Sequence, residues 1–367
     1  MMTNEKSNGK KRISPLLAFT AVISVCCLFC CFIIIALLVF EMRRTNTGVP
    51  VTQINLSDTT NDSQPHAYTE EEYLLAISEA RAEADLEARA DVKNEIKQLY
   101  MNGSSIVDGL RTLYPDDVVY YHDGGYQFVP INPNLPAFPY SKEGINLLES
   151  KEIQYIENNE VVSVKGIDIS KYQENVDWEK VAASGIEFAM IRVGIRGYGT
   201  GEIVLDGTFE TNMEGATKAG IDVGVYFFSQ AVNEAEAIEE ANFVLEQIAS
   251  YPVTYPIVLD VEELDDSAAR TAKLTKEERT KCAVAFLETI RNAGYTPMIY
   301  GNLKSFFHML DFEQVKDYER WFAFYDTDIY FPYDVSIWQY TDKGHVDGIN
   351  GNVDLNIMFQ KKEWEHP

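Results

Sequence analysis

The chain has few basic residues, few histidines and, outside one short segment, almost no cysteine. Its 367 residues include 57 Asp and Glu but only 31 Lys and Arg, which gives a formal net charge of −26. Residues 1–44 hold six basic and two acidic residues, so residues 45–367 carry a net charge of −30. A surface this acidic repels nucleic acid and anionic membrane surfaces, and neutral glycans or cationic partners fit it better.

Four of the five cysteines lie between positions 26 and 31. No His or carboxylate accompanies them, so helix packing or lipidation explains them better than metal ligation does. The remaining chain holds only Cys282 and can form no internal disulfide. Its stability must come from a hydrophobic core, which a chain of this length can supply.

Residues 13–40 contain no charged side chain. A helix needs roughly 20 residues to cross a bilayer, whereas a cleavable signal has an apolar core of only ~7–15 residues. Because four basic residues precede this run, we interpret it as an uncleaved transmembrane signal anchor, with residues 1–12 as a cytoplasmic tail and the rest of the chain outside the cell. A buried helix of a soluble protein is the alternative.

A flexible linker is predicted over residues 41–68, which are rich in Thr, Asn, Ser and Asp. Thr69 and Glu72 then form a capping-box pattern ahead of a helix that runs to about Tyr100. Its apolar stripe is mostly alanine, which is typical of a spacer stalk or of a weak coiled coil that self-associates. The stalk and a small α+β segment, with a hairpin at Gly124–Gly125, make up residues 69–160; the sequence assigns this segment no role.

From residue 161 to residue 367 the pattern becomes regular, and apolar runs alternate with helical segments. Such alternation indicates parallel strands covered on both faces, and eight strands within about 200 residues predict a closed, TIM-like (β/α) barrel. The eight runs are 165–170, 188–194, 222–229, 256–262, 296–302, 320–326, 335–341 and 352–359.

The last connections of this barrel are too short for helices. Residues 327–334 and 342–351 leave no room for a crossover helix, so we expect missing helices in the last third and at least one antiparallel strand. If the eighth strand runs antiparallel, it begins at the rim where the other strands end, and Asp354 joins that rim.

Polar and aromatic residues gather at the predicted carboxyl ends of the strands, where barrel enzymes carry their chemistry. Asp260 and Glu262, two apart on one strand, should point into the barrel mouth together. An ion-paired rim is the alternative for this pair, and aromatic residues on a strand are more often core than sugar platforms. The candidate residues are Asp168, Tyr226, Asp260, Glu262, Tyr300, Asn302, Trp338, Gln339, Tyr340 and Asp354.

Several carboxylates among aromatic rings suit glycoside hydrolysis. Cleavage of an acetal needs one acid that stays protonated and negative charge near the oxocarbenium-like carbon. The charges of Asp168, Asp260 and Asp354 should raise the pKa of Glu262. Tyr226, Tyr300, Trp338 and Tyr340 offer flat faces for sugar rings.

At these residues the chain resembles glycoside hydrolase family 25, the lysozymes that cut bacterial peptidoglycan. The resemblance covers about residues 164–359 and is carried by "GIDIS" with "YQ", "GVYFF", "LDVE", "IYGN", "WQY" and "VDLN" in this order. It implies cleavage of the β-1,4 bond between N-acetylmuramic acid and N-acetylglucosamine without a cofactor or metal.

The resemblance also implies roles for the carboxylates. Glu262 would be the general acid, while Asp260, Asp168 and Asp354 would orient the substrate and stabilise positive charge. Inverting, retaining and substrate-assisted routes all use these residues, and we favour assistance by the substrate's N-acetyl group. The resemblance leaves residues 1–163 unexplained, and no repeat-type wall-binding module is recognisable in the sequence.

Two other functions are weighed against this one. A non-catalytic barrel that only binds wall glycan would be expected to lack the acid, and Glu262 is present. A metal-dependent hydrolase would need histidines at strand ends, and none of the five is predicted there. They are His66, His122, His308, His345 and His366.

Overall fold

The computed structural model describes residues 69–367. The predicted cytoplasmic tail, signal anchor and linker (1–12, 13–40 and 41–68) therefore lie outside the described residues. Between residues 69 and 367, no helix combines the length and the hydrophobicity needed to span a bilayer. The chain divides into two units, 1–79 and 80–367.

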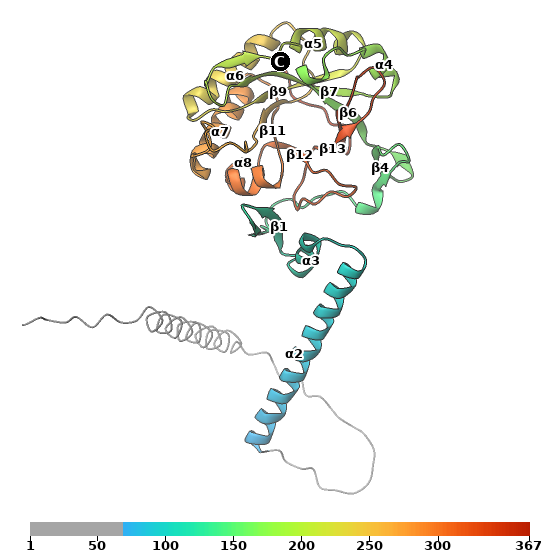
Figure 1. Ribbon diagram of the computed structural model, residues 1–367, viewed down its shortest axis with the longest axis vertical. Helices are drawn as coiled ribbons and strands as arrows, with labels where there is room; N and C mark the ends of the chain where they lie inside the picture. Colours follow the sequence, from blue (N-terminus) through green and yellow to red (C-terminus); the bar gives the residue numbers. More distant parts are fainter. Residues whose placement is uncertain (1–68) are drawn as a thin grey trace, which may run out of the picture. The chain divides into compact units, whose positions relative to one another are not determined.

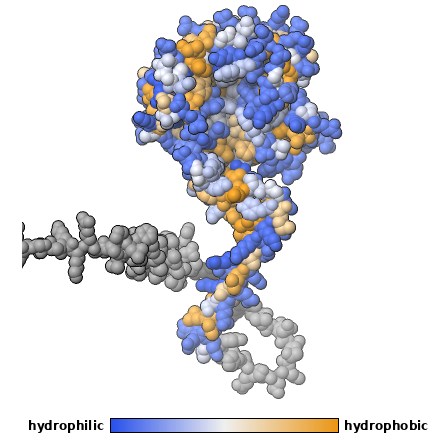
Figure 2. Space-filling view, in the orientation of Figure 1, coloured by the Kyte–Doolittle hydropathy of each residue, from blue (hydrophilic) through white to orange (hydrophobic). Residues whose placement is uncertain are grey.

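Helix α2 (Glu70–Met101) begins in the first unit and is one continuous helix of 32 residues (Figure 1). Its capping box is formed as predicted: the Thr69 backbone N–H donates to a Glu72 carboxylate oxygen at 2.8 Å, and the Glu72 N–H donates to the Thr69 hydroxyl at 3.3 Å. No residue of α2 is buried in the described part of the chain, and apolar side chains such as Leu75 and Leu86 are exposed along it (Figure 2). Self-association through this helix stays a prediction.

A small set of helices and strands follows α2. Helix α3 (Ile106–Leu113) precedes an antiparallel hairpin of β1 (Asp117–His122) and β2 (Gly125–Pro130). Asp123 and Gly124 connect the two strands with φ values of +51° and +75°, the left-handed conformations that a two-residue type I′ turn requires. A three-stranded sheet follows, with β3 (Ile145–Leu147), β4 (Ile153–Glu157) and β5 (Glu160–Val161).

This segment shares the hydrophobic core of the barrel. The Tyr330 hydroxyl accepts from the Val119 N–H at 2.9 Å and donates to the Asp117 carbonyl at 3.2 Å. Tyr140 stacks on Phe359 with ring centroids 4.4 Å apart. The β1–β2 hairpin is thus fixed to the barrel by hydrogen bonds at its base.

Eight strands close into a barrel, as predicted, because the first strand pairs with both the second and the last (Figure 1). A further short strand, β8 (Ile203–Leu205), extends β7 outside the closed ring. The barrel strands are β6 (Val164–Ile169), β7 (Phe188–Arg196), β9 (Asp222–Phe228), β10 (Ile257–Asp260), β11 (Pro297–Gly301), β12 (Glu319–Ala323), β13 (Ile337–Gly344) and β14 (Val353–Met358).

The direction of the last strand also agrees with the prediction. Strand β14 runs antiparallel to both β13 and β6, whereas the other neighbouring pairs of the ring are parallel. Asp354, near the start of β14, consequently lies opposite Asp168, near the end of β6. This places both carboxyl groups at the same rim.

The helices are unevenly distributed around the barrel. No helix is found between β12 and β13 or between β13 and β14, so the expected loss of helices in the last third is confirmed for these described connections. The helices of the earlier connections are α4 (Trp178–Ala183), α5 (Phe209–Lys218), α6 (Glu234–Ile248) and α7 (Lys276–Asn292), and β11 is followed by a π-helical turn (Ser305–Met309) and α8 (Phe312–Val315).

The barrel interior is filled below the rim. Val164, Met190, Met298 and Met358 belong to an apolar cluster on which the rings of Tyr226 and Tyr300 pack. Gly166 has no side chain because a Cβ there would lie 2.2 Å from the Phe188 ring. This packed cluster forms the floor beneath the residues at the rim.

Candidate active site

A cavity of about 480 Å³ opens at the carboxyl ends of the barrel strands. It is lined by residues of β6, β7, β9, β11, β12, β13 and β14 and by the residues that end and follow β10. All four predicted carboxyl residues line it, and so do three of the predicted substrate-binding residues. These seven are Asp168, Asp260, Glu262, Asp354, Tyr226, Tyr300 and Gln339.

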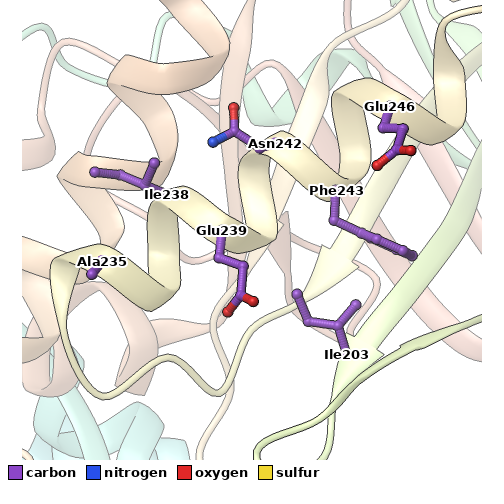
Figure 3. Close-up of a pocket in the computed structure, with 7 residues that line it drawn as sticks. All are labelled: Ile203, Ala235, Ile238, Glu239, Asn242, Phe243 and Glu246. Atoms are coloured by element: carbon purple, nitrogen blue, oxygen red, sulfur yellow. The ribbon is translucent and has the colours of Figure 1, made fainter.

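A second hollow, of about 600 Å³, lies between Ile203 and the outer face of α6 (Figure 3). Its apolar lining includes Ile238 and Phe243, and Glu239 and Glu246 are separated along the helix rather than paired (Figure 3). This hollow lacks the convergent polar groups that chemistry requires, so the cavity at the barrel mouth is the candidate active site.

The buried carboxylate of Asp168 is held by two side-chain amides. Gln339 Nε2 and Asn356 Nδ2 each donate to Asp168 Oδ2 at 2.8 Å. Burial raises the pKa of Asp168, and the hydrogen bonds from the Asn356 and Gln339 amides oppose that rise. The amides therefore favour the ionised form of this side chain.

A further layer of hydrogen bonds orients these two amides. Trp321 Nε1 donates to Asn356 Oδ1 at 2.7 Å, and both residues are fully buried. The hydroxyls of Tyr300 and Tyr325 each donate to Gln339 Oε1 at 2.8 Å. With both carbonyl oxygens occupied as acceptors, each amide must turn its N–H groups toward Asp168.

Asp354 faces Asp168 across the β6–β14 pair. Burial, followed by the charge of Asp168, raises the pKa of Asp354 to about 9. Two like charges in one desolvated site are costly, so one proton stays with this pair at neutral pH. We assign that proton to Asp354 because the amide donors stabilise the charge on Asp168.

Asp260 and Glu262 form a second coupled pair. Strand β10 ends at Asp260, earlier than expected, but the Val261 N–H still donates to the Tyr300 carbonyl at 3.2 Å and Glu262 still lines the cavity. Burial, followed by the charge of Glu262, raises the pKa of Asp260 well above its usual range, and burial also raises the pKa of Glu262. Both carboxyl groups therefore hold a proton more strongly than isolated carboxyl groups do.

Three predicted residues do not line the cavity. Trp338 is fully buried on the outer face of β13, where its indole N–H donates to the Phe324 carbonyl at 2.8 Å, and Tyr340 is buried on the same face. Side chains alternate along a strand, so once Gln339 points inward its two neighbours must point outward. Asn302 instead caps a turn, because its Oδ1 accepts from the Lys304 N–H at 2.9 Å.

Several cavity residues were missed by the sequence analysis. Arg192 lies on β7 and forms an ion pair with Asp206 at 2.7 Å. Tyr172, Tyr198 and Tyr325 lie outside the regular strands with 74%, 53% and 53% of their surface exposed, and thus offer open rings for stacking. The remaining missed residues include Trp321 and Asp342. Two of them had a sequence signal: Arg192 stands on the same strand face as Met190, and Tyr172 belongs to the "YQ" motif.

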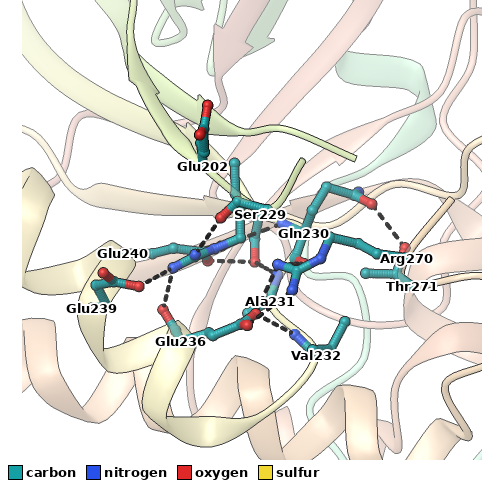
Figure 4. Close-up of polar contacts among 12 residues, drawn as sticks. Glu202, Ser229, Gln230, Ala231, Val232, Glu236, Glu239, Glu240, Arg270 and Thr271 are labelled. Atoms are coloured by element: carbon teal, nitrogen blue, oxygen red, sulfur yellow. Dashed lines mark hydrogen bonds and ion pairs between the residues drawn. The ribbon is translucent and has the colours of Figure 1, made fainter. Parts of the chain in front are cut away.

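A buried polar network ties together the loops that follow β7, β9 and β10 (Figure 4). Arg196 donates to the buried Glu240 at 2.7 Å, and Ser229 donates to the other oxygen of Glu240 at 2.6 Å. Burial raises the pKa of Glu240 to about 7. From the loop after β10, Arg270 pairs with Glu236 at 2.8 Å. The loop that carries Glu262 is therefore anchored to the rest of the rim.

Among the described residues, no group of three or more His, Cys, Asp or Glu side chains has an arrangement that could hold a metal ion. The site consists of carboxyl groups, amides, one paired arginine and aromatic rings. Such a set can transfer a proton and stabilise a developing cation.

Comparisons with known proteins agree with this picture. The model of glycosyl hydrolases family 25 matches residues 167–349. The uncharacterized protein YegX of Escherichia coli O157:H7 is 32% identical over 213 residues, which are 55% of this chain and 71% of YegX. The autolytic lysozyme of Clostridium acetobutylicum is 28% identical over 197 residues, or 53% of this chain and 55% of that protein.

Among solved structures, the modular autolysin LytC from Streptococcus pneumoniae in complex with a synthetic peptidoglycan ligand has a TM-score of 0.50 and 23% identity. The alignment covers 66% of this chain and 57% of LytC, and it is a likeness of fold. The family model lies on the barrel, and YegX is matched over more than two thirds of its length. The chain belongs to glycosyl hydrolase family 25.

Proposed function

We propose that this chain is a peptidoglycan hydrolase that cleaves the β-1,4 bond between N-acetylmuramic acid and N-acetylglucosamine. The observation that carries the proposal is the convergence of two carboxyl pairs, Asp168–Asp354 and Asp260–Glu262, in one cavity that exposed tyrosines also line. The names of the matched autolytic lysozyme and of LytC with its peptidoglycan ligand support this substrate class.

In this proposal the proton of the Asp260–Glu262 pair is used for acid catalysis. Glu262 gives it to the glycosidic oxygen as the bond from that oxygen to the anomeric carbon breaks. Asp260 is the more buried of the two carboxyl groups, and binding of the sugar beside Glu262 would shift the shared proton from Asp260 to Glu262. The ionised Asp168 stabilises the positive charge that develops on the sugar ring.

The amide-held Asp168 keeps its charge during the reaction because Asp354 holds the neighbouring proton. Tyr172, Tyr198 and Tyr325 would stack on sugar rings along the cleft. We favour participation of the substrate's N-acetyl group as the internal nucleophile, with Asp260 orienting it. An inverting route would give the opposite anomer of the product, whereas a retaining route with a carboxylate nucleophile would give the same anomer but pass through a covalent glycosyl-enzyme intermediate.

We also propose that the apolar run at residues 13–40 anchors the protein in the cell membrane as a single span. The absence of charge over those residues and the basic residues before them support a cytoplasmic amino terminus and an extracellular barrel. The barrel would then act on wall glycan next to the membrane.

Glu262→Gln is the direct test of the proposed chemistry. The amide preserves size but cannot donate the proton, so release of new reducing ends from purified peptidoglycan should fall by about 10²–10⁴-fold. Glu246→Gln on the exposed face of α6 makes the same charge change far from the cavity and should leave the rate within twofold. If the wild-type protein and Glu262→Gln bind wall glycan equally well and neither releases new reducing ends, the barrel is a binding module and the proposed chemistry is wrong.

A further inference from the structure

A third cavity, of about 790 Å³, adjoins the candidate active site. Leu264 lines both cavities, and the consecutive residues Glu262 and Glu263 line the first and the second respectively. The loop after β10 thus lines both cavities, and Glu262 lies next to the residues that they share.

The opposite wall comes from the β1–β2 hairpin, through Tyr121, His122 and Asp123. These residues lie outside the part of the chain that the family model matches, 167–349. The cavity is therefore built jointly by the catalytic barrel and by the preceding segment for which the sequence suggested no role.

Contacts at the hairpin tip hold this wall in place. The buried His122 packs against His308 with ring centroids 4.2 Å apart, and its Nδ1 lies 4.0 Å from a carboxylate oxygen of Glu263. Lys304 donates to the same Glu263 oxygen at 2.6 Å. Together with the hydrogen bonds from Tyr330 at its base, these contacts fix the hairpin against the loop that carries the proposed acid.

The lining carries both signs of charge. Arg279 donates to the Thr271 carbonyl at 2.7 Å, and within the described chain neither Arg279 nor Lys273 has a carboxylate within ion-pair distance. Asp123, Asp265 and Asp266 supply carboxylates, and Tyr121 adds a ring with 60% of its surface exposed. A short peptide with free carboxylate and ammonium groups complements such a lining, whereas an uncharged sugar leaves these charges unpaired.

We propose that this cavity binds the peptide stem that muramic acid carries next to the bond to be cleaved. The inference rests on the proposed function, because it needs a stem-bearing glycan in the neighbouring cleft. Lys273 and Arg279 would pair with stem carboxylates, and the aspartates would pair with a stem ammonium group. The β1–β2 hairpin would then make the enzyme specific for walls that still carry their stems.

The test uses the full-length protein and two forms of one substrate: purified peptidoglycan, and the same glycan stripped of its stems by an amidase. On the stem-bearing glycan, Lys273→Ala and Tyr121→Ala should each raise KM about tenfold, the size of one lost ionic or stacking contact, with kcat unchanged. On the stem-free glycan the same substitutions should raise KM by less than twofold. Lys281→Ala, which removes the same charge from the exposed face of α7, should have no effect on either substrate.

Equal losses on both substrates, or no loss on either, would overturn the stem site. Calorimetric titration of the synthetic tetrapeptide L-alanyl-D-glutamyl-L-lysyl-D-alanine into the full-length protein separates this inference from the proposed function. Binding that Lys273→Ala weakens about tenfold supports the site even if no glycan is cut, and absence of binding to the wild-type protein refutes it even if the glycan is cut normally.

Discussion

Replacement of Asn356 by leucine should damage both stability and catalysis, because this buried amide joins two layers of the site. It donates to Asp168 at 2.8 Å and accepts from the Trp321 indole at 2.7 Å. Leucine fills nearly the same volume but makes neither bond. Loss of a hydrogen bond to a charged group costs about 1.5–3 kcal/mol, and an unpaired buried N–H costs about 1–3 kcal/mol, so the free energy of unfolding should fall by about 3–6 kcal/mol.

A double-mutant cycle separates the two costs. Trp321→Phe alone removes the indole N–H and leaves the Asn356 amide oxygen without a donor. In the double variant the amide oxygen is also absent, so no buried polar group of this pair is left unpaired. The double variant should consequently be about 1–3 kcal/mol more stable than the sum of the two single changes predicts. Activity at neutral pH should fall in Asn356→Leu, since the pKa of Asp168 rises when one of its two amide donors is lost.

Urea unfolding of the full-length chain, followed by far-ultraviolet circular dichroism, measures these free energies. Additivity of the two single changes within about 0.5 kcal/mol would show that the Trp321–Asn356 hydrogen bond does not contribute as described. An Asn356→Leu variant that unfolds more readily but cleaves wall glycan at the wild-type rate would refute the role given to the amide in keeping Asp168 ionised.

Two further predictions concern pH and topology. The folded-state pKa of Asp354, about 9, lies above the ordinary 3.8, so the native state keeps a proton that the unfolded chain releases, and stability should fall as pH rises between these values. Asp354→Asn cannot ionise and should raise the melting temperature at pH 8 but not at pH 4; an equal effect at both pH values would contradict the pairing with Asp168. Protease added to intact protoplasts should remove the barrel, and full protection of the barrel would reverse the proposed membrane orientation.

The architecture could be predicted from the sequence because its signals are local. Eight apolar runs predicted the strands, and the short connection before the eighth run predicted the antiparallel return that places Asp354 opposite Asp168. The short connection before the seventh run also lacks a helix, but it joins two parallel strands, β12 and β13. Both features depend on connection length and on period-two burial, which a single sequence displays.

The errors at the site have a physical explanation. Trp338, Gln339 and Tyr340 are consecutive, and strand geometry allows only Gln339 to face the cavity if its two neighbours pack on the outer face of the strand. Asn302 was assigned from its position after a strand, but a short polar side chain there often bonds to the backbone of the following turn. The exposed tyrosines lie outside the strands, where no periodicity indicates which way a side chain points.

The contribution of the β1–β2 hairpin could not be predicted for a different reason. His122 and Glu263 lie 141 positions apart in the sequence, and no pattern in either segment indicates that they meet. Their proximity depends on the packing of Tyr330 and Tyr140 against the barrel, which only the three-dimensional structure shows.

Mass spectrometry of the fragments released from purified peptidoglycan tests the central claim most directly. The protein should release soluble fragments whose reducing ends, after borohydride reduction, are all N-acetylmuramic acid, and Glu262→Gln should release about 10²–10⁴-fold fewer of them. Fragments that end in N-acetylglucosamine, or free peptides with intact glycan strands, would contradict the proposed bond and the role of the carboxyl cluster.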